Sequence, residues 1–182
     1  MGKESAERIQ TSLLSKAEKK ALVWLAQRQP GWITSDTLTY IGVLGTVIYA
    51  IGGWLSNTDI KYLWLSSFGL VLHWYGDSLD GTLPVYGFFI DHTLDAVTTC
   101  LIFLGAGLSP MFRMDVALAA LAGYLSLSIY TYVCTIVKEE FCLTYGKLGP
   151  TEFRLLLILL NILYMYTSWS EWHVDWRGIE WG

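Results

Sequence analysis

The sequence predicts an all-α protein, a polytopic bundle of transmembrane helices that follows an amphipathic helix lying on the membrane surface. Three observations predict this fold class. Hydrophobic residues make up 53% of the 182 residues and charged residues only 15%, whereas about a quarter of the residues of a soluble domain are charged. Apolar runs long enough to cross a bilayer recur along the chain. The nine Trp and eleven Tyr residues are of the types that gather at membrane–water boundaries.

The same composition excludes two classes of protein. Disordered chains combine low hydrophobicity with high net charge, and this chain has neither. Its formal net charge of −4 leaves no global basic surface for nucleic acid. An integral membrane protein is therefore expected.

Residues 1–34 form the first predicted unit. Glu7–Gln29 has the pattern of a helix in the plane of the membrane interface, with Trp24 as an anchor, and Pro30-Gly31 ends it. Packing of this helix against a soluble partner is the alternative. Its predicted apolar side consists of Leu13, Leu14, Ala17, Ala21 and Leu25, with Lys16, Lys19 and Lys20 mostly opposite.

Residues 35–182 form the predicted transmembrane domain. A helix needs about 20 apolar residues to cross a bilayer, and five runs approach this length, the last being short. Nine of the twelve Lys and Arg residues lie on the cytoplasmic side if the N-terminus does, and this bias favours that orientation. The five predicted spans are Thr39–Leu55, Tyr62–Leu79, Tyr86–Leu108, Val116–Val137 and Phe153–Tyr166.

Acidic residues gather where the second span ends and the third begins, on the predicted cytoplasmic side. Asp77 and Asp80 are spaced i,i+3, and Gly87, Asp91 and Asp95 repeat at i,i+4, so each set shares one face of its helix. A hairpin of the two spans can aim four carboxylates into one cavity. Scattered aspartates that are solvated at helix ends, with a purely structural role, are the alternative.

Carboxylates at membrane depth need a counter-charge. Each ionised group costs at least about 2.5 kcal/mol on insertion scales, and no Lys or Arg lies between Asp77 and Asp95. Hard oxygen ligands in this number suit Mg²⁺, Mn²⁺ or Ca²⁺. A cation transporter or channel is another possibility for such a cluster, but it predicts acidic residues spread across the depth of the bilayer. The expected metal ligands are Asp77, Asp80, Asp91 and Asp95.

The acidic motif resembles the signature of the CDP-alcohol phosphotransferase (CDP-alcohol phosphatidyltransferase) family. That signature reads Asp-x-x-Asp-Gly-x-x-Ala-Arg, a spacer of about eight residues, and Gly-x-x-x-Asp-x-x-x-Asp. The residues that match it are Asp77, Asp80, Gly81, Gly87, Asp91 and Asp95. Weaker similarities are the Thr-Ser-Asp-x-Leu-Thr entry to the first span and Gly149–Glu152 before the fifth.

The resemblance implies a membrane enzyme of phospholipid synthesis, usually with six spans. It would transfer a phosphoalcohol or phosphatidyl group from a CDP-linked donor to a lipid or alcohol acceptor and release CMP. Two Mg²⁺ or Mn²⁺ ions are implied on the four aspartates, and a homodimer is a further expectation. Asp95 is the implied base, acting with Asp91, and the implied nucleotide site comprises Gly81, Gly87, Asp77 and Thr39.

The chain departs from the signature after Gly81. Pro84 follows where the family has Ala-Arg and its spacer, and only five residues separate Gly81 from Gly87. The missing stretch would contain an arginine used towards the donor nucleotide. Either the protein lacks this stretch, which would suit a catalytically silent relative, or residues are missing from the printed sequence. The second interpretation is favoured because a link of five residues that contains Pro84 leaves little room for a turn between two long helices.

Two histidines lie close to the motif. His73 is one turn before Asp77, but a lone histidine in a span is more often part of a hydrogen-bonded structure. His92 points about 100° away from Asp91 on the helix, so packing is more plausible for it than metal ligation. Thr151-Glu152 is interpreted as a helix cap with an acidic residue favourably placed in the first turn.

Overall fold

The computed structural model describes residues 15–30, 33–80, 88–138 and 150–167. This part of the chain is helical and contains no strand, which confirms the all-α prediction. The elements are α1 (Ser15–Ala26), α2 (Ser35–Leu55), a 3₁₀ turn η1 (Ile60–Tyr62), α3 (Leu63–Asp80), α4 (Phe88–Leu108), α5 (Met114–Lys138) and α6 (Pro150–Tyr166).

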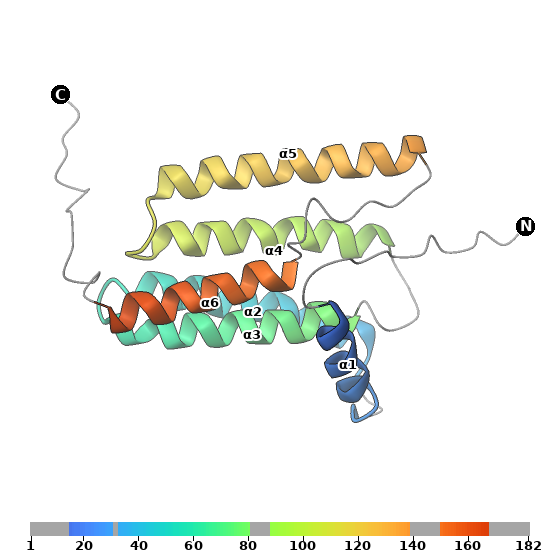
Figure 1. The fold of residues 1–182 in the computed structure, drawn as a ribbon, viewed down its shortest axis with the longest axis horizontal. Helices are drawn as coiled ribbons and strands as arrows, with labels where there is room; N and C mark the ends of the chain where they lie inside the picture. The colour runs from blue at the N-terminus through green and yellow to red at the C-terminus, as the bar shows by residue number, and fades with distance from the viewer. Residues whose placement is uncertain (1–14, 31–32, 81–87, 139–149, 168–182) are drawn as a thin grey trace, which may run out of the picture.

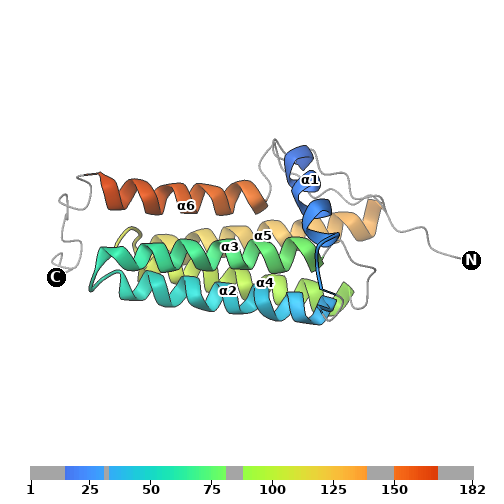
Figure 2. The same ribbon diagram turned by 90° about the horizontal axis from the view of Figure 1, so that it is seen from below.

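Helices α2 to α6 run side by side, and α1 lies across one end of the bundle (Figure 1, Figure 2). Helix α2 packs on α3 and α4, α5 packs on α4, and α6 packs on α3. The start of α2, the end of α3 and the start of α4 therefore meet at the end of the bundle where α1 lies. The acidic motif is found at this end.

Glycines allow the backbones of α2 and α3 to touch. A Cβ atom on Gly52 would lie 2.5 Å from the backbone nitrogen of Ser66, and one on Gly69 would lie 2.6 Å from the carbonyl oxygen of Gly45. A Cβ on Gly76 would likewise meet the backbone of Gly42. Residues later in α2 therefore face residues earlier in α3, as in an antiparallel pair of helices. Small residues at such crossings are typical of helix pairs in membranes. The register fixes the start of α2 against the end of α3.

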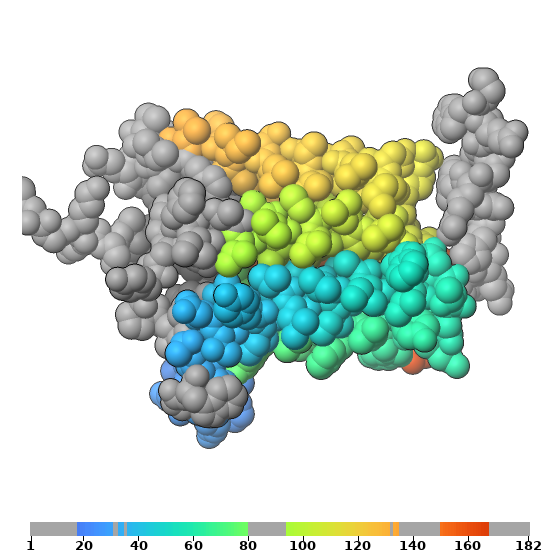
Figure 3. Space-filling view, turned by 180° about the vertical axis from the view of Figure 1, so that it is seen from behind, coloured from blue at the N-terminus to red at the C-terminus, as the bar shows by residue number. Residues whose placement is uncertain are grey.

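The bundle has polar as well as apolar side chains in its interior and many large apolar side chains on its surface. Polar side chains lie inside, and Asn161 of α6 donates a hydrogen bond of 3.0 Å to the Ser67 hydroxyl of α3. Apolar side chains cover much of the outside, and α2, which lies at the surface in Figure 3, is one example. Its exposed apolar residues recur every three or four positions and are Tyr40, Leu44, Val47, Ile51 and Trp54.

Two helices in the described ranges are long and apolar enough to cross a membrane. They contain Asp36–Leu55 of α2 and Met114–Thr131 of α5, and Leu94–Leu108 of α4 is a shorter apolar segment. Only 11% of the α5 segment is buried, so α5 is unlike the core helix of a soluble protein. The five long helices coincide with the five predicted spans within a few residues, but crossing by all five stays a prediction.

Helix α1 confirms a helix within the predicted N-terminal segment, whose residues 1–14 lie outside the described part. Its buried face matches the predicted one at Leu25, which packs against the bundle, and differs from it at two neighbouring positions. Ala21 is exposed, whereas Leu22 packs against Leu38 and Leu79, because α1 rests on the ends of α2 and α3. The outer face carries Trp24, 54% exposed, with the Arg28 guanidinium 4.1 Å above its ring. The position of α1 in the membrane interface stays a prediction.

Candidate functional site

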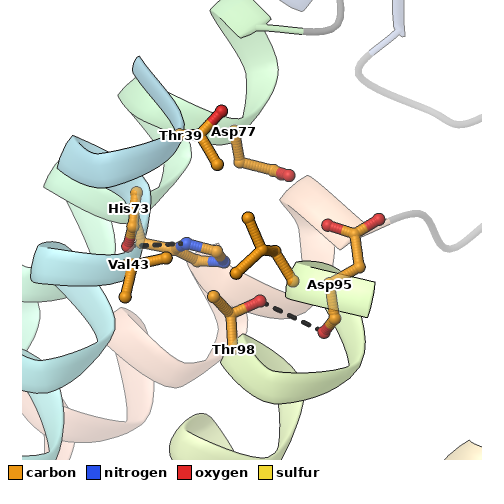
Figure 4. Close-up of a pocket in the computed structure, with 8 residues that line it drawn as sticks. Thr39, Val43, His73, Asp77, Asp95 and Thr98 are labelled. Atoms are coloured by element: carbon orange, nitrogen blue, oxygen red, sulfur yellow. Dashed lines mark hydrogen bonds between the residues drawn. The ribbon is translucent and has the colours of Figure 1, made fainter. Parts of the chain in front are cut away.

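A pocket opens among α2, α3 and α4 near the end of the bundle where α1 lies (Figure 4). Three consecutive segments of the chain contribute to it, because the α2–α3 register and the packing of α4 on α2 bring them together. The pocket is lined by Thr39, Gly42 and Val43 of α2, His73 and Asp77 of α3, and Leu94, Asp95 and Thr98 of α4.

Two of the four predicted metal ligands line this pocket. Asp77 comes from α3 and Asp95 from α4, and Figure 4 shows both carboxylates turned towards the same open space. The Thr98 hydroxyl donates a hydrogen bond of 3.1 Å to the backbone carbonyl of Asp95. Thr39, predicted for the nucleotide site, lines the same pocket. The structure thus brings together three predicted site residues from three helices.

The remaining predicted residues are described only in part. Asp80 is the last residue of α3, and Asp91 lies in the first turn of α4, so both stand on the helices that their spacing predicted. Their side chains, with Gly81 and Gly87, lie outside the described residues. Among the side chains that are described, no three His, Cys, Asp or Glu residues gather closely enough to hold a metal. The convergence of all four carboxylates stays a prediction.

Arg154 of α6 was not anticipated as a site residue. Its guanidinium forms an ion pair with the Asp77 carboxylate, and only 8% of the residue is exposed. This cation lies outside the segment between Asp77 and Asp95 in which a counter-charge was sought, and α6 brings it to Asp77 because it packs on α3. Metal binding by the carboxylates stays a prediction. A signal was present in the sequence, since an arginine inside an apolar run needs a partner within the bundle.

His73 links Arg154 to α2. Its Nδ1 lies 3.2 Å from the Gly42 carbonyl oxygen, and its Nε2 lies 3.1 Å from Nη2 of Arg154. The Gly42 carbonyl can only accept a hydrogen bond, so Nδ1 carries the proton and donates this bond. The Arg154 guanidinium can only donate, so Nε2 accepts. His73 is therefore neutral in this arrangement. The prediction of a hydrogen-bonded histidine is confirmed, and His73 also lines the pocket.

The charged groups form one cluster with a hydroxyl at its side. Tyr124 of α5, on the helix that packs on α4, lies at the side of these groups. Its ring contacts Phe103 at a centroid distance of 6.0 Å. The cluster therefore extends from α3 and α4 towards α5 and α6, and it combines hard oxygen ligands, a fixed cation and groups that can hold a proton.

Helix α1 braces the two helices that carry the ion pair. The Glu18 carboxylate accepts hydrogen bonds from the indole Nε1 of Trp74, at 3.2 Å, and from the Thr151 hydroxyl. Trp74 is one turn from Asp77, and Thr151 is one turn from Arg154. Thr151 is the second residue of α6 and bonds to α1, so the cap interpretation is wrong for it, while Glu152 does lie in the first turn.

The comparisons with known proteins point to one kind of enzyme. No family model matches the chain. The chain is similar to cholinephosphotransferase 1 of Danio rerio, with 25% identity over 170 residues that cover 83% of this chain and 43% of that protein. Cholinephosphotransferase 1 of Gallus gallus is 23% identical over 168 residues, covering 82% of this chain and 48% of the relative.

The extent of these matches is informative. The chain spans less than half the length of the curated relatives it matches. The matched stretch is 170 residues long but takes in only 83% of the 182 residues here. The stretch therefore includes positions of the relative that have no counterpart in this chain.

Proposed function

We propose that this chain is a CDP-alcohol phosphotransferase of phospholipid synthesis. It transfers a phosphoalcohol or phosphatidyl group from a CDP-linked donor to the hydroxyl of a lipid or alcohol acceptor, and CMP is released. The observation that carries this proposal is the presence of Asp77 and Asp95, one from each half of the acidic signature, on the wall of one pocket. The similarity to two cholinephosphotransferases supports it and makes CDP-choline the first donor to test.

The chemistry of the pocket fits Mg²⁺ or Mn²⁺. Asp77 and Asp95 offer hard carboxylate oxygens to the same space, which these ions prefer. We propose that Asp80 and Asp91, one helical turn away from them, complete a site for two ions. Such ions would offset the charge of the donor diphosphate and stabilise the leaving oxygen of CMP.

The residues of the chain would handle the acceptor and its proton. The acceptor oxygen attacks the phosphorus that bears the alcohol, the bond from that phosphorus to the oxygen of CMP breaks, and Asp95 takes the acceptor proton. Asp91, one turn away on α4, supports Asp95. Gly81 and Gly87 would let the backbone approach the nucleotide, and Thr39 lines the same pocket.

The surface and charge of the chain support a multi-pass membrane protein with a cytoplasmic active site. Exposed apolar residues cover the long helices, and basic residues concentrate on the predicted inner side. We propose that α2 to α6 all cross the bilayer and that α1 lies at the inner interface. The acceptor lipid would then reach the pocket from the membrane, and assembly into a homodimer is part of the same proposal.

The test is an assay of CMP release by the purified chain in lipid vesicles. Donors linked to choline, ethanolamine, glycerol and diacylglycerol are each offered with lipid or alcohol acceptors, and the lipid product is identified by mass spectrometry. We expect CMP to appear with one donor class and to disappear when EDTA removes divalent ions. Nucleotide binding without turnover would favour a silent relative. Cation flux without nucleotide would favour a transporter.

A further inference from the structure

Arg154 has a position that a merely structural arginine does not need. Of the Lys and Arg side chains that the structure describes, it is the buried one. Both of its partners, His73 and Asp77, line the pocket. The guanidinium therefore contacts two residues of the pocket wall.

The contacts of Arg154 fix the guanidinium through one of its nitrogens. Nη2 has two hydrogens, and these are directed to Asp77 and His73. His73 is held in turn by the carbonyl of Gly42. A guanidinium has three more N–H groups, on Nε and Nη1, in a rigid planar fork. The position of that fork is thus set by α2, α3 and α6 before any ligand binds.

A fixed guanidinium beside two carboxylates suits a ligand with several anionic oxygens. Arginine binds phosphate groups through paired N–H donors, and such charge-assisted bonds are about twice as strong as neutral ones. The acidic motif has no Lys or Arg between Asp77 and Asp95. A donor diphosphate in the pocket would therefore meet carboxylates on α3 and α4, and Arg154 of α6 is a protein cation that can add to the charge of the proposed metal ions.

We propose that Arg154 binds the diphosphate of the CDP-linked donor and so supplies, from α6, a phosphate-binding arginine to a signature that has none in the printed sequence. This inference rests on the proposed function. It assigns a phosphate-binding role to a residue outside the signature, on a helix that follows it by more than fifty residues in the chain. Asp77 then has two roles, as a proposed metal ligand and as the group that orients Arg154.

A structural role for Arg154 is the competing explanation, because its ion pair joins α3 to α6. The chain offers a matched control for this role. Asn161, also on α6 and buried, donates a hydrogen bond to Ser67 of α3 and is two turns away from Arg154. Asn161→Ala weakens the same pair of helices without removing a cation.

The experiment measures the affinities for CDP and for cytidine, by calorimetry or by displacement of a labelled nucleotide, with the full chain in detergent and Mg²⁺ present. Cytidine lacks the diphosphate, so the ratio of the two affinities isolates the phosphate contacts. We expect Arg154→Gln to weaken CDP binding by about tenfold to a hundredfold and to leave cytidine binding unchanged. Arg154→Lys keeps the charge but loses the planar fork of N–H donors. Its ratio of CDP affinity to cytidine affinity should therefore lie between those of the wild type and of Arg154→Gln. Asn161→Ala should keep the wild-type ratio.

Each outcome decides the matter. An unchanged ratio in Arg154→Gln, or an equal loss in Asn161→Ala, overturns the inference while CDP binding by the wild-type chain leaves the proposed function standing. If the wild-type chain does not bind CDP, the proposed function and the inference fail together. If Arg154→Gln does not fold, Arg154→Lys is decisive, because a wild-type ratio in that variant contradicts recognition by the fork and a reduced ratio supports it.

Discussion

Arg154 of α6 forms an ion pair with Asp77 of α3, a residue that lies 77 positions earlier in the chain. The two side chains differ in exposure, with 10% for the arginine and 29% for the aspartate. The pair therefore lies at the edge of the protein interior, where one partner is desolvated and the other still reaches the pocket. Loss of either partner leaves the other charge without compensation.

The first prediction concerns the stability of this pair. Arg154→Met should lower the free energy of unfolding by about 2 kcal/mol, less than the 3–5 kcal/mol typical of a fully buried pair, because Asp77 is partly solvated. Asp77→Asn combined with Arg154→Met should cost less than the sum of the single changes. Unfolding of the four proteins in detergent gives the coupling energy. Strictly additive losses would show that the pair contributes no coupling.

The sequence predicts the parts of this site that depend on local periodicity. The spacing of Asp77 and Asp80 predicted one face of α3, and that of Asp91 and Asp95 predicted one face of α4. Because the spans are consecutive, the two sets were expected at the same end of the bundle. The structure brings Asp77 and Asp95 to one pocket, as expected.

The parts that were not predicted depend on packing between elements distant in sequence. Arg154 meets Asp77 only because α6 packs on α3, and helical periodicity carries no information on that choice. The same holds for the face of α1. Ala21 and Leu22 are equally compatible with an apolar side, and contact with Leu38 and Leu79 decides that Leu22 is buried.

The second prediction concerns the proposed base. Asp95→Asn and Asp91→Asn keep the size of the side chain but remove its charge and its ability to take a proton. Each should reduce CMP release by at least about a hundredfold, within the range typical of a lost general base, while the protein still elutes as a folded species. Asp115→Asn is the control, because Asp115 is exposed, pairs with Arg113 and lies at the opposite end of the bundle. Full activity in both site variants would remove the assignment.

The third prediction concerns the close contact of α2 and α3. A Cβ atom on Gly45 would lie 2.7 Å from the Gly69 carbonyl oxygen and 2.8 Å from Cα of His73. Gly45→Ala should therefore separate the helices and cost about 1–3 kcal/mol of stability. It should also weaken CDP binding, because His73 holds Arg154.

A matched glycine tests whether this effect comes from the contact. Gly123 is also helical, and a Cβ atom there would meet nothing within 4 Å. Gly123→Ala should leave stability unchanged or raise it by up to about 1 kcal/mol through helix propensity. Thermal unfolding in detergent compares the two variants. Equal behaviour of Gly45→Ala and Gly123→Ala would exclude the close contact.

The fourth prediction concerns the short link after Gly81. If residues are missing from the printed sequence, the intact mass of the protein purified from its natural source will exceed 20.5 kDa, and a peptide joining Asp80 to Phe88 will contain additional residues. Intact-mass and peptide mass spectrometry measure both. A mass of 20.5 kDa would instead establish the short link, and recognition of the donor would then depend on cations outside the signature.

The fifth prediction concerns the brace between α1 and the site. Glu18→Ala removes the carboxylate that accepts from Trp74 and Thr151, and each hydrogen bond to a charged group contributes about 1.5–3 kcal/mol. The amides of α1 should then exchange with deuterium at least about tenfold faster. Glu18→Gln keeps an accepting oxygen and should show a smaller effect.

Lys19→Ala is the control, because Lys19 is exposed on the same helix. Since Trp74 and Thr151 are each one turn from the ion-paired residues, release of α1 should also loosen Arg154 and weaken CDP binding. Exchange in Glu18→Ala no faster than in Lys19→Ala would mean that contacts other than those of Glu18, such as the packing of Leu22, hold α1 on the bundle.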